Sequence, residues 1–436
     1  MKKARAYINI FKLRVNMALK RKRLHNYPVQ AYIEPTLFCN LRCPACPTGL
    51  QLGLRPSATM KWDLFKSAVD EIGDYVFSLY MYNWGEPLLH RQTPEMIRYA
   101  KEKGINIILS TNLSLKLSDD YIERLVQSGL DRLTVSLDGT TAETYSKYRL
   151  RGEFQLVREN MARIQAVKKE LGMQTPEIVW QFLVFKHNED QIEEARADYK
   201  EWGADAVSIE GAIMPVPPYD KGYEPSTIAT YNMYDPDHHF QRDTEKHDRS
   251  GRPCSWLYGV FVLNPNGKVS PCCASAEEAT DFGEYKVGDG FFDVWNNAVF
   301  KRARALFSRN GHSIPSVPAP EPTQNGLVQI QHTTSNQIGS EGADLIAGMG
   351  LGVSGALKGD ELICEKCPIP WRQDDVLNVI SEEVVRLVRI IQVSNSLKTT
   401  ARAVFAYLLM GAPEFRVWSP RAVRRLVKSF SFTANL

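Results

Sequence analysis

The sequence predicts an α/β fold in which six β-α repeats build a parallel sheet. Between residues 28 and 212, apolar strand-like runs alternate with amphipathic helix-like stretches. Glycines follow several of the helix-like stretches, where a helix end favours left-handed backbone. Such an alternation places reactive residues in the loops that follow the strands.

The individual elements follow from the apolar pattern. The predicted strands are Ala31–Phe38, Tyr75–Tyr82, Ile105–Ser110, Arg132–Leu137, Ile178–Val184 and Ala206–Ile209. The predicted helices between them are Trp62–Ile72, Pro94–Lys103, Ser118–Ser128, Phe154–Leu171 and Glu189–Trp202.

Three cysteines directly follow the first predicted strand. Cys39, Cys43 and Cys46 have the spacing C-x3-C-x2-C, and no fourth cysteine or histidine lies close by in sequence. A closed tetrahedral zinc site needs four ligands, whereas three thiolates suit a cubane iron–sulfur cluster with one iron left free. A chance grouping and a partial zinc site are the alternatives.

The spacing resembles the signature of the radical S-adenosylmethionine (SAM) enzymes. This resemblance implies a partial (β/α)6 TIM-like barrel and a 4Fe-4S cluster whose free iron chelates SAM. It also implies that an electron from the cluster cleaves SAM to methionine and a 5′-deoxyadenosyl radical, which abstracts hydrogen from a substrate. Ala45 departs from the family pattern, because the position before the third cysteine is often aromatic.

The segment after the second predicted strand, Asn83–Leu88, resembles the family's Gly-Gly-Glu-Pro segment. Trp84 replaces the first glycine of that motif, whereas Gly85 and Glu86 match it. The resemblance implies that the backbone at Gly85 and the carboxylate of Glu86 receive the methionine amino group of SAM, since an ammonium needs oxygen acceptors. A turn built by glycine and proline is the alternative.

Polar residues at the ends of the third and fourth predicted strands complete the expected SAM site. Thr111 and Asn112 offer a hydroxyl and an amide to the ribose or the carboxylate of SAM. Family resemblance favours Ser136, with Arg149 or Arg151 as the cationic partner of the SAM carboxylate, because a guanidinium matches a carboxylate in two bonds. The alternative is that Thr111 and Asn112 only cap loops and helices.

The remaining five cysteines form a second pattern. Four of them supply a complete set of thiolates, with Cys273 left over: Cys254, Cys272, Cys364 and Cys367. A predicted hairpin, Val260–Asn264 and Lys268–Ser270, carries ligands at either end. The layout resembles the twitch/SPASM extension of radical SAM enzymes, most closely its shortened twitch form, which implies an auxiliary 4Fe-4S cluster. A zinc site with four cysteines is the alternative.

Charge is divided unevenly along the 436 residues, although the net charge is only +3. Residues 1–26 carry nine lysines and arginines and no acid, and residues 396–436 carry seven against one glutamate. Both ends are amphipathic, and one helical face of the first holds Ala4, Tyr7, Ile8 and Phe11. Such helices suit peripheral contact with an anionic membrane, or docking on the acidic body of the protein.

The longest apolar run, Ala403–Ala412, is too short to span a bilayer, and no nucleic-acid-binding module accompanies the charge.

The expected organisation has five parts. They are a basic amphipathic helix (1–27), a radical SAM partial barrel (28–213), a linker (214–252), a small α+β auxiliary-cluster domain (253–375) with a flexible insertion (312–360), and a basic helical tail (376–436). The cysteines lie in metal-ligand spacings and no signal peptide precedes them, so we expect metal ligands in a reducing cytoplasm rather than disulfides.

Together with these observations, the resemblance predicts a cytoplasmic radical SAM oxidoreductase. Resemblance to twitch-bearing relatives implies the dehydrogenation of a small polar metabolite, with the auxiliary cluster as acceptor of the second electron and a flavodoxin- or ferredoxin-type protein as reductant. The alternatives are a lipid- or cell-envelope-modifying enzyme, a peptide-modifying enzyme and a non-catalytic metal-binding protein. Fewer than 30 residues precede the predicted barrel, which weakens the peptide alternative. No general base is assigned, although Gln181 and Glu210 lie near strand ends.

Overall fold

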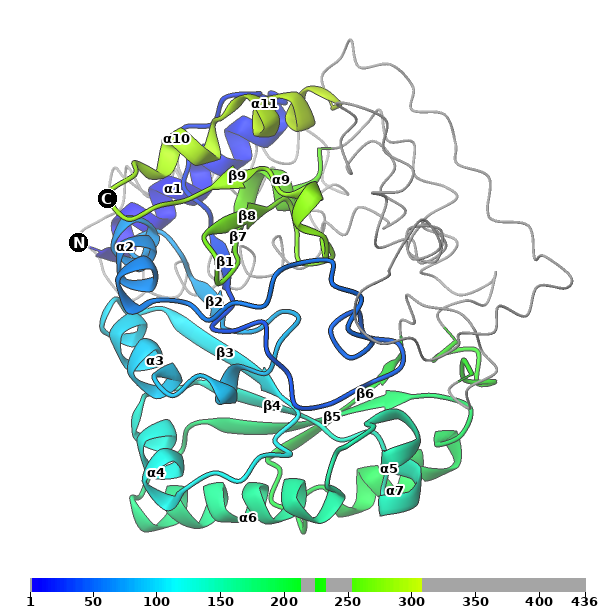
Figure 1. The fold of residues 1–436 in the computed structure, drawn as a ribbon. Helices are drawn as coiled ribbons and strands as arrows, with labels where there is room; N and C mark the ends of the chain where they lie inside the picture. The colour runs from blue at the N-terminus through cyan, green and yellow to red at the C-terminus, as the bar shows by residue number, and fades with distance from the viewer. Residues whose placement is uncertain (1, 213–223, 233–252, 308–436) are drawn as a thin grey trace, which may run out of the picture.

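The computed structural model describes residues 2–212, 224–232 and 253–307 (Figure 1). Within these residues, six parallel strands lie side by side in chain order, as six β-α repeats require. They are β1 (Gln30–Ile33), β2 (Ser78–Tyr80), β3 (Asn106–Thr111), β4 (Arg132–Ser136), β5 (Glu177–Val184) and β6 (Ala206–Gly211). Among the described strands β6 forms an edge and does not pair with β1, so the expected partial barrel is confirmed.

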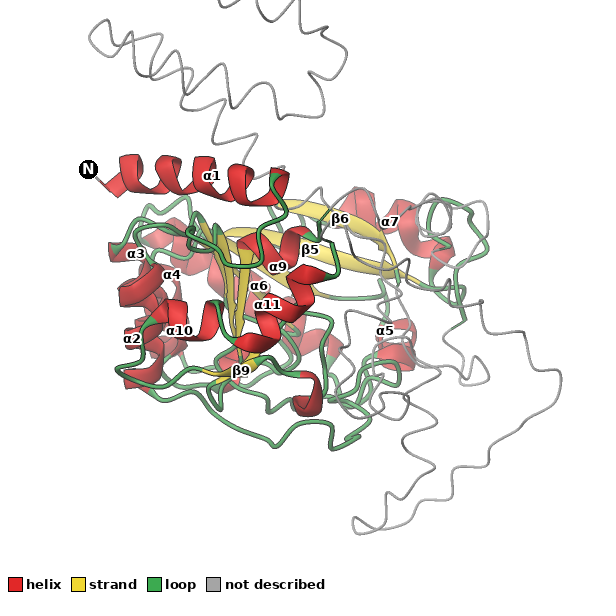
Figure 2. Ribbon diagram, turned by 90° about the horizontal axis from the view of Figure 1, so that it is seen from above, coloured by secondary structure: helices red, strands yellow, loops and turns green. Residues whose placement is uncertain are grey.

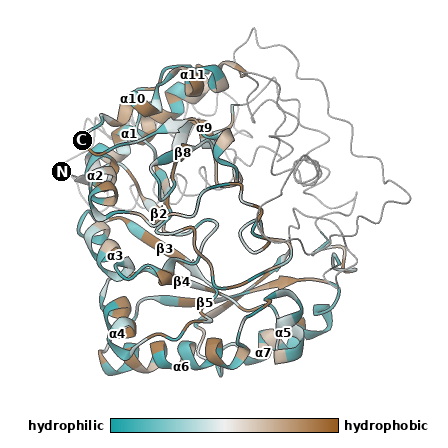
Figure 3. Cartoon of the chain, viewed as in Figure 1, coloured by the Kyte–Doolittle hydropathy of each residue, from teal (hydrophilic) through white to brown (hydrophobic). Residues whose placement is uncertain are grey.

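The helices that follow the strands cover the outer face of the sheet (Figures 1 and 2). They are α2 (Trp62–Ile72), α3 (Thr93–Glu102), α4 (Asp119–Gln127), α6 (Phe154–Glu170) and α7 (Ile192–Asp198). In α4 the Ser118 hydroxyl accepts a hydrogen bond from the Tyr121 N–H at 3.2 Å, which caps the first turn. Figure 3 shows the apolar strands enclosed by these helices, whose outward faces are more polar.

Several local features differ from the elements expected from sequence: β2 is shorter than Tyr75–Tyr82, and α7 ends at Asp198 instead of Trp202. Helix α5 (Ala142–Tyr148) was not predicted, because seven residues are too few to show a helical period. Strand β1 ends at Ile33 instead of Phe38, since the following residues leave the sheet. Thr36 forms an isolated bridge with Thr59, and the Leu37 N–H donates to the Ala58 carbonyl at 2.9 Å.

The C-terminal extension continues the same sheet. Strand β7 (Val260–Leu263) pairs in parallel with β1 and places Phe261 beside Ala31, on the side of β1 opposite to β2. The predicted hairpin is confirmed: β8 (Lys268–Ser270) pairs antiparallel with β7, and β9 (Gly283–Glu284) follows β8. The extension also contains the short helices α9 (Ser255–Gly259), α10 (Phe291–Trp295) and α11 (Ala298–Ala305).

Helix α1 (Lys2–Ala18) packs against α9 with a face other than the one expected from sequence. Ile10 and Leu13 are fully buried, whereas Ile8 is 57% exposed. The Asn9 side chain binds both backbone groups of Tyr27, at 3.0 and 2.7 Å. The helix is therefore part of the folded body, with a second, partly apolar face outward. Within the described residues, no helix has the length and apolar character needed to cross a bilayer.

Candidate active site at the cysteine loop

The loop after β1 brings the first three cysteines into one small apolar cluster. Cys43 is buried, and Cys39 and Cys46 are half-buried beside Tyr148 and Phe185. The loop turns back on itself, because the Cys46 N–H donates to the Cys43 carbonyl at 3.1 Å. Residue 49 is glycine where a Cβ would collide with the backbone of Cys43. The predicted site is thus assembled by one tight loop.

The chemistry of this pocket fits an iron–sulfur cluster better than one metal ion. Within the described residues, no three His, Cys, Asp or Glu side chains converge closely enough to hold one ion. A cubane cluster attaches each thiolate to a different iron, so its ligands need not converge on one point. Burial raises the pKa of the Cys39 thiol to about 12 and that of Cys43 to about 11, so these ligands become thiolates only against a strong cationic centre.

Glu86 is a buried carboxylate that joins the ends of β2 and β3. It accepts hydrogen bonds from the Thr111 hydroxyl at 2.6 Å, the Asn112 N–H at 2.7 Å and the Leu88 N–H at 3.1 Å. Burial raises its pKa to about 7 in spite of these donors. The carboxylate expected to meet the SAM ammonium is therefore already bound by three donors of the protein itself.

Asn112 connects this carboxylate to the cysteine loop. Its backbone is held by Glu86, while its side-chain nitrogen contacts the Cys39 Sγ at 3.8 Å and the Asn40 Oδ1 at 3.0 Å. The next residue, Leu113, is buried with a φ of +53°, a conformation that is costly for leucine. Strained backbone at this strand end is consistent with a site that needs Asn112 in one position.

Arg149, at the end of α5, lies beside the second cysteine. Its Nε donates to the Asp138 Oδ2 at 2.5 Å, and its Nη1 contacts the Cys43 Sγ at 3.9 Å. The sequence-based expectation paired this guanidinium with the SAM carboxylate. In the structure Arg149 has a carboxylate partner within the protein, whereas Arg151 is exposed.

Ser136 lies at the start of a polar row across the ends of β4, β5 and β6. Its hydroxyl donates to the Gln181 Oε1 at 3.3 Å, and the Gln181 Nε2 donates to the Glu210 Oε2 at 3.1 Å. The three residues named from sequence at these strand ends are thus brought together. No described contact distinguishes one of them as a base.

Glu34 and Trp84 form a part of the site that sequence reasoning did not identify. The Oε1 of Glu34 accepts the backbone N–H groups of Trp84 and Gly85, both at 2.6 Å. Gly85 packs so closely against the Thr36 backbone that no side chain would fit there. Burial raises the pKa of Glu34 to about 7. The sequence offered one signal for this role, because Glu34 is the single acidic residue in the first predicted strand.

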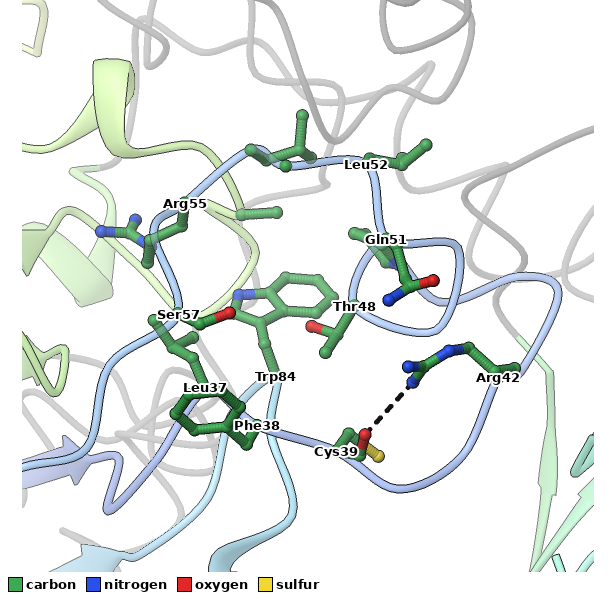
Figure 4. Close-up of a pocket in the computed structure, with 14 residues that line it drawn as sticks. Leu37, Phe38, Cys39, Arg42, Thr48, Gln51, Leu52, Arg55, Ser57 and Trp84 are labelled. Atoms are coloured by element: carbon green, nitrogen blue, oxygen red, sulfur yellow. Dashed lines mark hydrogen bonds between the residues drawn. The ribbon is translucent and has the colours of Figure 1, made fainter. Parts of the chain in front are cut away.

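A pocket of about 200 Å³ lies between the cysteine loop and the extension. Figure 4 shows the Trp84 side chain reaching into the middle of this pocket, with Cys39 and Arg42 on one side. Ala276 of the extension contributes to the lining, as does Phe38, which is 51% exposed. Trp84, noted from sequence only as a departure from a motif, is thus a wall of the pocket nearest to the cysteines.

The second cysteine set is described only in part. Cys254 precedes α9, and the antiparallel pairing of β8 with β7 returns Cys272 toward the end of the hairpin where α9 lies. Cys254, Cys272 and Cys273 are half-buried. One orientation of the Asn83 side-chain amide gives both of its polar atoms a hydrogen-bond partner. In that orientation the nitrogen donates to the Cys273 carbonyl and the oxygen accepts from the Trp84 indole N–H, each at 3.1 Å. Cys364 and Cys367, the insertion (312–360) and the C-terminal tail (376–436) lie outside the described residues, as does the linker (214–252) except for residues 224–232.

Two family profiles match the chain at the positions of these two sites. The radical SAM superfamily profile matches residues 33–198, and the profile of the SPASM iron–sulfur cluster-binding domain matches residues 254–317. The chain carries a radical SAM domain followed by a SPASM domain. The radical SAM domain implies a 4Fe-4S cluster and SAM at the cysteine loop, and the SPASM domain implies auxiliary iron–sulfur binding in the extension. The SPASM match ends before Cys364.

Proteins similar in sequence to this chain are named for different activities. An AdoMet-dependent heme synthase of Methanosarcina barkeri is 32% identical over 31% of this chain and 38% of its own length. The PqqA peptide cyclase of Rhodopseudomonas palustris is 25% identical over 64% of this chain and 76% of its own length. The chain thus spans well under half of the first relative and about three quarters of the second.

The fold is similar to that of a solved structure. SuiB of Streptococcus suis, bound to S-adenosylmethionine, aligns with a TM-score of 0.50 and 16% identity, over 66% of this chain and 70% of SuiB. At this identity the likeness concerns the fold, which agrees with a partial barrel followed by a small C-terminal domain.

Proposed function

We propose that this protein is a radical SAM enzyme that abstracts a hydrogen atom from its substrate with a 5′-deoxyadenosyl radical. The observation that carries the proposal is the grouping of Cys39, Cys43 and Cys46 in one apolar cluster, with N–H donors directed at two of the sulfurs. When bound, the cluster supplies the electron that cleaves SAM. The protein's own residues hold SAM, exclude water and orient the substrate.

The residues proposed to hold SAM surround the cysteine loop. The Gly85 backbone is held by Glu34 and packs against Thr36, and its carbonyl oxygen is the proposed acceptor for the methionine amino group. Thr111, Asn112 and Ser136 lie at neighbouring strand ends, where their side chains suit the ribose hydroxyls and the carboxylate. Glu86 supports this arrangement by holding Thr111 and Asn112 in place.

The proposed reaction is a net oxidation. Loss of one hydrogen atom leaves a substrate radical, and loss of a further electron and a proton completes a two-electron oxidation. The loop with Cys272 and Cys273 supports an electron acceptor near the site, because Asn83 bridges the Cys273 carbonyl and the Trp84 indole. A protein of the flavodoxin or ferredoxin type is the proposed source of the first electron.

A peptide is the substrate class that the comparisons support best. The relative named as a peptide cyclase aligns with 64% of this chain and 76% of its own length. The pocket beside Trp84 is lined by the exposed ring of Phe38 and by the polar side chains of Thr48 and Gln51. An extended chain with alternating apolar and polar groups suits such a surface. A small polar metabolite remains the second candidate.

Anaerobic reconstitution with iron and sulfide tests the cluster assignment. We expect about eight irons per chain, in two cubanes, and release of 5′-deoxyadenosine from SAM under reduction. Replacing Cys39, Cys43 and Cys46 by alanine should remove about half of the iron and all of the 5′-deoxyadenosine. Cys273→Ala is the matched control and should keep both. Four irons together with one zinc would contradict the auxiliary cluster, and no 5′-deoxyadenosine with any reductant would contradict the radical function.

Deuterium transfer tests the substrate class. The enzyme is offered extracts of cells grown in deuterated water, separated into peptide and small-molecule fractions. Mass spectrometry of 5′-deoxyadenosine should show deuterium from the peptide fraction. Label from the small-molecule fraction alone would contradict the peptide proposal and favour the metabolite.

A further inference from the structure

The fold holds the positive charge of Arg149 against the Cys43 sulfur, whereas Arg42 of the loop donates to the Cys39 carbonyl at 3.2 Å. The Arg149 guanidinium and the Asp138 carboxylate are buried partners, and Asp138 is itself fixed by the Leu183 N–H at 2.9 Å. Burial by itself would lower the pKa of Arg149, but the Asp138 carboxylate outweighs it and holds the pKa well above its usual range, so the guanidinium stays charged. Because Asp138 occupies the Nε side, the Nη1 edge faces the Cys43 sulfur.

The two contacted sulfurs have donors of different charge. The Cys43 sulfur lies 3.9 Å from the charged guanidinium of Arg149, whereas the Cys39 sulfur lies 3.8 Å from the neutral side-chain amide of Asn112. A sulfur that ligates iron is electron-rich and accepts such hydrogen bonds more strongly when the cluster is reduced. Hydrogen bonds to sulfur and nearby charge are among the factors that set the reduction potential of an iron–sulfur cluster. A charged donor is the stronger of the two.

We propose that Arg149, held by Asp138, is a positioning residue that donates an N–H to the ligating sulfur of Cys43 and raises the reduction potential of the cluster. This inference rests on the proposed radical SAM function. The electron still comes from the external reductant and passes on to SAM; Arg149 changes only how readily the cluster accepts it. The role differs from a contact with the SAM carboxylate, because it operates before SAM binds.

The test is a redox titration of the reconstituted full chain without SAM, followed by electron paramagnetic resonance. The relevant signal is the one that changes when SAM is added afterwards. The variants are Arg149→Met, which removes the charge, and Arg149→Lys, which keeps it. Arg151→Met is the matched control, since it removes the same charge from an exposed position two residues away.

We expect Arg149→Met to shift the midpoint potential of the cluster to a more negative value. The expected shift is about 59 mV, which corresponds to a tenfold decrease in the equilibrium constant for one-electron reduction. Arg149→Lys keeps the charge, so its midpoint potential should lie close to that of the wild type. Arg151→Met should leave the potential unchanged. Arg149→Met with a full iron content and an unchanged potential would overturn the inference, even if SAM binding were weakened.

A second variant covers the case in which Arg149→Met fails to retain iron because Asp138 is left buried and unpaired. Arg149→Met combined with Asp138→Asn removes that unpaired charge, and a potential below that of the wild type is again expected. An unchanged potential in the double variant would overturn the inference. A wild-type chain that assembles no iron–sulfur cluster would contradict the proposed function, and this inference with it.

Discussion

Arg55 and Asp281 form a buried ion pair that joins the loop after the cysteines to the C-terminal extension. The two side chains are 3% and 4% exposed, and the Arg55 Nη2 donates to the Asp281 Oδ1 at 2.9 Å. The same nitrogen donates to the Glu277 carbonyl at 3.2 Å, and the Glu278 N–H donates to the Leu54 carbonyl at 3.0 Å. The cysteine loop and the auxiliary cysteine loop are thus held together outside the sheet.

Arg55→Ala should lower the free energy of unfolding by about 3–5 kcal/mol, because it leaves the Asp281 charge buried without its partner. The change is measured by chemical denaturation of the reconstituted protein. Arg55→Met with Asp281→Leu removes both charges and should cost less. Arg196→Ala is the control, since its pair with Glu193 is 47% and 81% exposed. Equal losses for Arg55→Ala and Arg196→Ala would contradict a buried tether.

Glu34 should make stability depend on pH. Burial raises its pKa from 4.5 to about 7, against the opposing effects of the Gly85 and Trp84 N–H groups and of Arg55. Between these pH values the folded protein retains a proton that the unfolded chain releases. The free energy of unfolding therefore falls as pH rises through this window, by about 3 kcal/mol from this group.

Glu34→Gln should flatten this fall, because the amide keeps an oxygen for both N–H groups and carries no charge. Thermal unfolding at pH 5 and pH 8 measures the difference between variant and wild type. Glu159→Gln, at an exposed position, is the control. An equally steep fall in Glu34→Gln and the wild type would contradict the raised pKa.

Glu86→Ala should destabilise the protein by about 3 kcal/mol or more, because three buried donors lose their acceptor. Glu86→Gln keeps one carbonyl oxygen and should be less damaging. Thermal unfolding reports the stability, and the iron content reports whether Asn112 still supports the cysteine loop. Loss of iron in Glu86→Ala without loss of stability would show that Glu86 acts mainly at the cluster.

Helix α1 should contribute to stability through its buried face. Leu13 is fully buried, so Leu13→Ala should cost about 2–5 kcal/mol, whereas Ile8→Ala should stay within about 0.5 kcal/mol. Denaturation curves compare the two. Similar losses of unfolding free energy in Leu13→Ala and Ile8→Ala would contradict the packing of α1 through its Leu13 face.

The outward face of α1 is the surface proposed to meet an anionic membrane. Ile8 and Leu19 are exposed there beside Lys12. We expect the protein to sediment with anionic vesicles at low salt, and Ile8→Ser with Lys12→Glu to reduce that fraction several-fold while leaving Leu13 packed. Sedimentation that is absent, or unchanged in the variant, would contradict membrane contact.

The sequence by itself determined the order of the six β-α repeats, the position of the cysteine loop after β1 and the hairpin of the extension. These features depend on apolar periodicity and turn residues, which act over a few neighbouring positions. The bounds of α2, α3, α4 and α6 agree with expectation to within one residue for that reason. The expected chemistry of the cysteine loop came from the resemblance of its spacing to a family signature.

The tertiary structure decided which partners the polar side chains take. Arg149 meets Cys43 across 106 positions in sequence, and Arg55 meets Asp281 across 226. It also decided that β7 pairs with β1, so that the extension belongs to the barrel's own sheet. A buried charge takes the partner that packing brings within reach, and the packing of distant segments leaves no mark on local sequence pattern.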